Sequence, residues 1–313
     1  MGPIYQLSRV EEMMLVEYLQ KMIREKNIRP SSSPVRSSIL LVPKPNGKAL
    51  RLCIDYRHLN DNTKKVKNPL PIMDEVSRKM RDCYFITEIN MKAGFHLMRM
   101  DMGHEKFTAF KTKFGLCEYM VMPFGLTKAP ATFQREINRI LRTLLRMELV
   151  IDTKLAIDDD GGMVVVAYID DILIATKGCL ENHHCQVSKA FQLLMDNHTF
   201  VEIDKCIFNV REVPFLGFIV SGSGLQMDPE NAGAIVNWPC PTNVKEVHQL
   251  LGLWNFYHRF VPGYAAIVAP ITDLLKGKTK SIQWLDAQEA AFLKITVFFT
   301  SGKTPILRHY DPN

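Results

Sequence analysis

The chain has 313 residues, of which 47% are hydrophobic and 23% charged, a composition typical of a globular protein large enough for two or three subdomains. The net charge of +6 favours polyanionic partners, and no apolar run in the sequence reaches the roughly 18 residues that a membrane span needs. Seven scattered cysteines predict reduced thiols, and the N-terminus lacks the pattern of a secretory signal peptide, so we expect an intracellular protein.

The first predicted elements are a helix and a hairpin. Residues 8–27 are predicted to be helical, because Ser8 is a favoured N-cap and Glu11 three residues later completes a capping box. Residues 39–43 and 50–56 have the composition of two strands, and the Pro-Asn-Gly-Lys turn at residues 45–48 joins them.

This hairpin lies in a strongly basic part of the chain. Residues 24–67 contain eleven Lys and Arg against three Asp and Glu, a net charge of +8 that exceeds the net charge of the whole chain. Lys44 and Arg51 flank the tip of the hairpin. We therefore expect a flap that grips phosphate groups, while the alternative is a solvated face, which is what most charge runs are.

Two stretches in the middle of the chain combine a turn with a neighbouring strand or helix. Residues 84–96 begin as an apolar strand, pass Asn90 and continue into a turn that contains Gly94. Residues 119–134 contain a Pro-Phe-Gly turn, followed by a helix with Pro130 in its first turn. A purely structural turn and helix is one reading of this second stretch.

Residues 164–175 carry a stronger chemical signal. Two runs rich in β-branched residues predict buried strands, and between them Asp170 and Asp171 form the tip of a hairpin. Burying two like charges is costly unless a cation offsets them, and carboxylate oxygens are ligands that suit Mg²⁺. The pattern predicts a divalent-metal site for phosphoryl or nucleotidyl transfer, and the alternative is a solvated turn.

Two other groups of potential metal ligands favour a bland interpretation. Three aspartates at residues 158–160 stand beside two glycines, which is typical of a solvated loop. The His-His-Cys run at residues 183–185 falls in a predicted helix, residues 181–197, where consecutive side chains point apart and do not form a zinc site. The chain continues with a predicted hairpin at residues 213–222 and predicted helices over residues 228–275.

Several stretches resemble the reverse transcriptase domain of gypsy-type LTR-retrotransposon Pol polyproteins, and the resemblance covers essentially all 313 residues. Among them are residues 28–34, 42–47, 51–60 and 119–134 and the Tyr-Ile-Asp-Asp tetrad at residues 168–171. The resemblance implies an α+β right-hand polymerase fold, with a palm made of an antiparallel sheet and helices. The implied subdomains are fingers at residues 1–68 and 98–127, palm at 69–97 and 128–222, thumb at 223–282, and the start of a connection to RNase H at 283–313, with RNase H itself absent.

The resemblance also implies a reaction, which is template-directed synthesis of DNA from retroelement RNA. The primer 3′-OH would attack a dNTP with the help of two metal ions, Mg²⁺ or Mn²⁺, held by Asp170 and Asp171. Lys205 is a possible general acid for pyrophosphate, and an ordinary surface lysine is the alternative. The other implied roles are triphosphate binding by Lys44 and Arg51, exclusion of the ribose 2′-OH by Phe95, lining of the dNTP pocket by Phe124 and Gly125, and a primer grip formed by Phe215, Leu216 and Gly217.

The family's first catalytic aspartate falls at Asn90, which is the most consequential departure in this sequence. Asparagine has nearly the shape of aspartate, but it is neutral and offers one acceptor oxygen. A two-metal site needs anionic ligands, so we expect weakened metal binding and impaired catalysis. The alternatives are a catalytically inactive relic that binds template–primer or protein, and a DNA-binding protein that needs no metal.

The expected partners follow from the same resemblance. They are an RNA/DNA template–primer duplex, dNTPs, and either a second subunit in a dimer or the remainder of a Pol polyprotein. We expect no membrane association and a cytoplasmic or particle-associated location.

Overall fold

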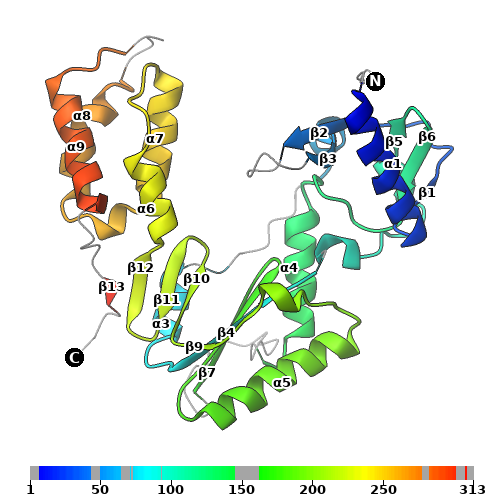
Figure 1. Cartoon of the computed structure of the whole chain (residues 1–313), viewed down its shortest axis with the longest axis horizontal. Coiled ribbons are helices and arrows are strands. Elements are labelled where there is room, and N and C mark those ends of the chain that lie inside the picture. The colour runs from blue at the N-terminus through cyan, green and yellow to red at the C-terminus, as the bar shows by residue number, and fades with distance from the viewer. Residues whose placement is uncertain are drawn as a thin grey trace.

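The computed structural model describes residues 7–43, 50–64, 71, 73–92, 94–144, 162–276, 282–300 and 307–308. Figure 1 shows the N-terminal elements and the C-terminal helices standing apart, with a central sheet and its helices between them at the base. The helices that are described include none that is long and apolar enough to cross a membrane. The expected turn at residues 45–48 and the acidic loop at residues 158–160 lie outside the described residues.

The N-terminal part packs one helix against short sheets. As predicted, Ser8 and Glu11 form a capping box at the start of the first helix. The predicted hairpin is also present, because its two strands pair in antiparallel register from Ile39 opposite Ile54 to Pro43 opposite Leu50. The elements are α1 (Arg9–Arg24), β1 (Ile28–Pro30), β2 (Ile39–Pro43), β3 (Leu50–Ile54), α2 (Arg57–Asp61), β5 (Phe110–Thr112) and β6 (Gly115–Tyr119), with a sheet order β1-β6-β5 and a separate β2-β3 pair.

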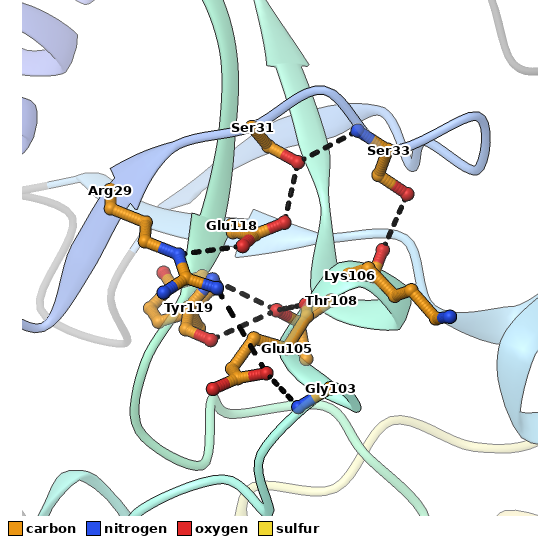
Figure 2. Close-up of polar contacts among 9 residues, drawn as sticks. All are labelled: Arg29, Ser31, Ser33, Gly103, Glu105, Lys106, Thr108, Glu118 and Tyr119. Atoms are coloured by element: carbon orange, nitrogen blue, oxygen red, sulfur yellow. Dashed lines mark hydrogen bonds and ion pairs between the residues drawn. The ribbon is translucent and has the colours of Figure 1, made fainter.

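A polar network fixes the three-stranded sheet to the short helix η2 (Glu105–Thr108), as Figure 2 shows. Arg29 Nε donates to Glu118 Oε1 at 2.7 Å, and Ser31 Oγ donates to the other carboxylate oxygen at 2.5 Å. The guanidinium also lies 4.0 Å from Glu105, whose side chain, like that of Glu118, is 8% exposed. Two nearly buried carboxylates therefore share one arginine, which offsets the cost of burying their charge.

The central sheet is antiparallel in the order β7-β8-β4-β9. Its strands are β4 (Phe85–Asn90), β7 (Met163–Tyr168), β8 (Asp171–Thr176) and β9 (Ile207–Val210), and helices α4 (Ala129–Ile140), α5 (Leu180–Asp196) and α3 (Met73–Lys79) accompany it. Alternate strand residues belong to different cores, because Ile89 and Ile172 pack with α4 and α5 whereas Ile86 and Leu173 pack with the C-terminal part. Asn90 and Asp171 are paired at the end of the sheet.

The C-terminal part joins a small sheet to a helical unit, and the predicted hairpin at residues 213–222 is confirmed within that sheet. One continuous core connects the sheet with the helices and includes Phe218, Trp254 and Tyr257. Its elements are β10 (Glu212–Phe215), β11 (Phe218–Ser221), β12 (Gly224–Met227), β13 (Leu307–Arg308), α6 (Pro229–Val236), α7 (Val244–Phe256), α8 (Tyr264–Asp273) and α9 (Asp286–Thr300).

His183, from the run that we did not interpret as a zinc site, is a fully buried structural residue of α5. Its Nε2 lies 2.7 Å from the Thr87 hydroxyl on β4, and its Nδ1 lies 2.8 Å from the Thr176 hydroxyl on β8. The imidazole therefore links α5 to two neighbouring strands of the central sheet. Burial lowers the pKa of His183 below its ordinary value of 6.5.

We predict that His183→Leu destabilises the protein by about 2 kcal/mol or more, because both threonine hydroxyls lose a buried partner. The unfolded chain binds a proton at His183 more readily than the folded chain does, so this group makes stability fall as pH drops below about 6.5. Urea unfolding between pH 8 and pH 5 measures both effects. The stability difference between the two proteins should shrink toward acidic pH, and a difference that is constant or grows would contradict this role.

Candidate active site

The acidic turn is built into the tip of the β7–β8 hairpin. Tyr168 pairs with Asp171 across the hairpin, and Ile169 and Asp170 form the turn between them. Ile169 has φ of 50°, in the left-handed region that β-branched residues rarely adopt. The surrounding structure must therefore hold this turn in place.

Gln134 of α4 provides that support, and the sequence analysis assigned it no role. Its Nε2 donates to the carbonyl of Ala167 at 2.8 Å, and its Oε1 accepts from the N–H of Ile169 at 2.8 Å. The side chain is fully buried. A buried amide that satisfies one acceptor and one donor of the same turn acts as a clamp on the backbone that carries the two aspartates. The available signal was a glutamine on the buried face of a helix beside Phe133.

Asp170 has a buried Oδ1 for which no hydrogen-bond partner exists among the residues that the structure describes. Gly94 makes room for this carboxylate, because a Cβ on Gly94 would lie 1.9 Å from Asp170 Oδ1. Burial raises the pKa of Asp170 to about 6, and the neighbouring charge of Asp171 adds to the shift. The protein thus holds a carboxylate in a place where its charged form lacks a compensating group.

Asn90 lies beside Asp171. Its Nδ2 donates to Asp171 Oδ1 at 2.7 Å, and the two residues face each other across β4 and β8. Burial raises the pKa of Asp171, and the hydrogen bond from Asn90 opposes this shift. The side-chain N–H of Asn90 therefore interacts with the same Asp171 carboxylate that a bound metal ion would contact.

Glu88 is a third acidic residue near the turn, and the sequence analysis assigned it no role. It precedes Asn90 by two positions on β4, so both side chains leave the same face of the strand. Burial raises the pKa of Glu88 to about 7, with a further contribution from the charge of Asp171. The period-2 spacing of Glu88 and Asn90 was the signal in the sequence that could have identified it.

Asp170 and Asp171 fit a cation, but with Asn90 as the third residue the set of anionic ligands is incomplete. The unpartnered oxygen of Asp170 and the raised pKa values of both aspartates indicate a pair of carboxylates that a divalent ion would stabilise. Within the described part of the chain, no three His, Cys, Asp or Glu side chains converge to hold a metal. The donors at the turn are therefore two carboxylates and the amide of Asn90.

The residues expected to line a nucleotide pocket form an aromatic cluster. The ring of Phe95 lies 5.1 Å from that of Phe124 and 5.6 Å from that of Phe133, and His96 lies 5.2 Å from Phe124. Phe124 is 52% exposed, so one part of this cluster is open to solvent. The structure thus brings Phe95 and Phe124 together from separate parts of the chain.

The turn at Gly125 is held by a residue that sequence reasoning did not identify. Asn60 Nδ2 donates to the carbonyl of Gly125 at 2.8 Å, and its Oδ1 accepts from the N–H of Thr127 at 2.8 Å. Gly125 has φ of 95°, which requires glycine or strains any other residue. Asn60 therefore fixes the Pro-Phe-Gly turn to α2.

The remaining expected site residues are placed in part. Lys44 lies outside the described residues, and for Arg51 the structure describes the backbone, which pairs with Val42. Lys205 is an exposed residue whose Nζ lies 2.8 Å from Glu202 Oε2, so it forms a surface ion pair. The β10–β11 turn contains Leu216 and Gly217, with φ of 51° and 82°, and Phe215 before it is buried.

We predict that Gln134→Met, which keeps a similar size, lowers the free energy of unfolding by about 1–3 kcal/mol, because the Ala167 carbonyl and the Ile169 N–H lose their buried partner. Asn138→Ala is the matched control, since it removes the remaining hydrogen bond of Gln134 without touching the turn. Chemical unfolding compares them. Equal stability of Gln134→Met and the unaltered chain would show that Gln134 is not a clamp.

We predict that Asp170→Asn stabilises the protein at pH 8, because it removes a half-buried charge whose buried Oδ1 has no partner in the described part of the chain. The unaltered Asp170 gains its proton in the folded state as pH falls through about 6, before it does so in the unfolded state near 3.8. The stability advantage of Asp170→Asn should therefore shrink between pH 6 and pH 4 in unfolding experiments. An advantage that grows toward acid, or a destabilised variant at pH 8, would contradict this assignment.

Comparison with known proteins places the chain in a family. Residues 42–220 match the family described as reverse transcriptase (RNA-dependent DNA polymerase). The chain is 37% identical, over 98% of its length, to the Retrovirus-related Pol polyprotein from transposon 297 of Drosophila melanogaster, and 33% identical, over 91%, to the Transposon Tf2-3 polyprotein of Schizosaccharomyces pombe. It spans 27% and 20% of those two proteins.

Solved structures show the same fold at lower sequence identity. A foamy viral protease-reverse transcriptase in complex with double-stranded DNA superposes with a TM-score of 0.85 at 21% identity, covering 99% of this chain and 51% of the other. A second foamy viral structure, in complex with an RNA/DNA hybrid, gives a TM-score of 0.80 at 20% identity and covers 99% and 39% of the two chains. The chain has the α+β right-hand polymerase fold and belongs to the reverse transcriptase family of LTR-retrotransposon Pol polyproteins.

Proposed function

We propose that this chain extends a primer on a retroelement RNA template by nucleotidyl transfer from dNTPs, at a rate that Asn90 reduces. The family to which it belongs carries out template-directed DNA synthesis. The observation that carries the proposal is the acidic turn, where Asp170 has an unpartnered buried oxygen beside Asp171. Such an arrangement is strongly disfavoured unless a positive group binds there.

Asp170 and Asp171 would hold Mg²⁺, or Mn²⁺ in its place, with Asn90 contributing at most one neutral oxygen. When bound, the ions stabilise the charge that develops as the primer 3′-OH attacks the α-phosphate of the dNTP. Gln134 and Gly94 keep the aspartates in position, the first through the turn backbone and the second by leaving space for Asp170. The loss of one anionic ligand weakens this site without removing it.

The aromatic cluster supports the proposed nucleotide pocket. Phe95 would lie under the sugar and exclude a ribose 2′-OH, while Phe124 and Gly125 would line the pocket beside the template. The contact between the two phenylalanine rings and the open face of Phe124 are consistent with these roles. Lys44 and Arg51 would bind the triphosphate from the β2–β3 hairpin.

The proposal also assigns residues to the primer end and to the pyrophosphate product. Phe215, Leu216 and Gly217 would grip the primer end through their tight turn. Lys205 would donate a proton to pyrophosphate, which requires its ion pair with Glu202 to open, and the surface-lysine alternative is favoured by that ion pair.

The subdomain boundaries, the partners and the location are also proposals that rest on the resemblance to the family. The fingers would comprise residues 1–68 and 98–127, the palm 69–97 and 128–222, the thumb 223–282, and the connection residues 283–313. The similar foamy viral enzymes are described in complex with double-stranded DNA and with an RNA/DNA hybrid, which supports a template–primer duplex as partner here. A second subunit or the remainder of a Pol polyprotein is a further proposed partner, and the location is proposed to be cytoplasmic or in a particle.

A second candidate function is template–primer binding without catalysis. The hydrogen bond from Asn90 to Asp171 favours it, because the amide already donates to one of the two carboxylates. Position 90 separates the two functions, since restoring the acid should restore catalysis if the rest of the site is intact.

We predict that Asn90→Asp increases the rate of primer extension on an RNA template by about 10–100-fold or more, because the site regains an anionic ligand. Extension by the unaltered chain and by Asn90→Asp is measured with Mg²⁺ and with Mn²⁺. Asn182→Asp on α5 is the control, since it makes the same change in charge on the helix that covers the other face of the sheet. Extension by neither protein would contradict the polymerase proposal and favour the binding function.

A further inference from the structure

The β10–β11 turn proposed as the primer grip is attached to the C-terminal helices by a buried tyrosine. Tyr257, which follows α7, is 2% exposed, and its hydroxyl donates to the carbonyl of Gly217 at 3.1 Å. Burial raises the pKa of Tyr257 to about 12, so the hydroxyl keeps its proton at neutral pH and remains a donor. The bond joins the turn to a residue that lies 40 positions later in the sequence.

The same turn leaves little space for a side chain at Gly217. A Cβ at this position would lie 3.2 Å from the Tyr257 hydroxyl oxygen and 3.4 Å from the ring of Phe256. Gly217 also has φ of 82°, which glycine adopts without strain. Both the backbone conformation and the close approach of these two aromatic residues therefore specify glycine at this position.

Aromatic packing makes the attachment rigid. The ring of Phe218, the first residue of β11, stacks on Phe256 at 4.9 Å and meets the edge of Tyr257 at 5.6 Å. Tyr257 also contacts Phe299 of α9, with ring centroids 6.4 Å apart. One tyrosine thus touches the turn, the strand after it and the last helix that the structure describes.

We propose that Tyr257 is a positioning residue that sets the primer-grip turn relative to the thumb helices, so that the 3′ end of the primer is placed by both together. This inference rests on the proposed function, because it assumes that the turn contacts the primer. Pairing of β10 with β11 fixes this two-residue turn within its hairpin, and setting the hairpin relative to the C-terminal helices requires a further constraint. The hydroxyl of Tyr257 supplies one, at the carbonyl that lies in the turn itself.

Primer seating can be measured without catalysis. The full 313-residue chain and its Tyr257→Phe variant are titrated with a template–primer duplex that carries 2-aminopurine at the primer 3′ end, and fluorescence anisotropy gives the duplex affinity. A second duplex carries the probe one helical turn upstream. Tyr264→Phe is the control, because it removes a tyrosine hydroxyl that donates to Asn255 within the thumb at 2.8 Å.

We expect Tyr257→Phe to keep its fold, with a Tm lowered by no more than about 4 °C for one lost hydrogen bond. Its duplex affinity should stay within about twofold of that of the unaltered chain, while the fluorescence change at the primer end falls by at least about half, since a small misplacement disturbs a positioned end. The upstream probe and Tyr264→Phe should show no such loss.

An end-probe signal equal to that of the unaltered chain, at equal duplex affinity, would overturn the inference and leave Tyr257 as a packing residue. A loss of signal from both probes together would overturn it as well, because the effect of the substitution would then be general. Failure of the unaltered chain to bind the duplex would instead contradict the proposed function, and this inference with it.

Discussion

Two half-buried carboxylates, close to each other at the β7–β8 turn, are the constraint on which the site depends. Their charged forms are disfavoured, as the raised pKa values of Asp170 and Asp171 indicate. Much of the surrounding structure holds them there nonetheless. Gln134 clamps a strained turn, Gly94 leaves the space that Asp170 occupies, and Asn90 bonds to Asp171 across the sheet. A fold organised for its own stability alone would not concentrate acidic groups in this place.

Asn90 alters the electrostatics of this centre more than its shape. The amide occupies the position of the expected aspartate, keeps the register of β4 and β8, and satisfies one oxygen of Asp171. One consequence is that the protein itself supplies a hydrogen-bond donor to one carboxylate of the site. The other is a lower negative charge for attracting a cation, with Glu88 as a further acidic group on the same face of β4. Asn90 thus keeps the strand pairing at the end of the sheet while it leaves one anionic group fewer than the expected aspartate would supply.

The sequence predicted those features that depend on local pattern. The capping box of α1, the β2–β3 hairpin and the β7–β8 hairpin follow from short-range preferences, and the structure has all of them. The tip is shifted by one residue from the expected Asp170 and Asp171, because Ile169 and Asp170 form the turn and Asp171 begins β8. The sequence did not predict contacts between distant segments. The clamp by Gln134 joins residues 35 positions apart, and the imidazole of His183 reaches a threonine 96 positions away.

Other outcomes depend on neighbours that no local pattern specifies. The ion pair of Lys205 with Glu202 follows from the one-turn geometry of a short helix, which the sequence analysis did not assign. The bond between Tyr257 and Gly217 requires the C-terminal helices to fold back onto the hairpin. Tertiary packing decides such contacts, so the local sequence pattern around each residue does not specify them.

The measurement that tests the central claim most directly is calorimetric titration of the chain with Mn²⁺ at neutral pH, beside Asp170→Asn and Asn90→Asp. The account predicts measurable binding by the unaltered chain, tighter binding by Asn90→Asp, and a loss of more than about tenfold in Asp170→Asn, because the unpartnered oxygen of Asp170 marks the cation site. Equal Mn²⁺ affinity in all three proteins would contradict it, since the acidic turn would then not be where a metal binds.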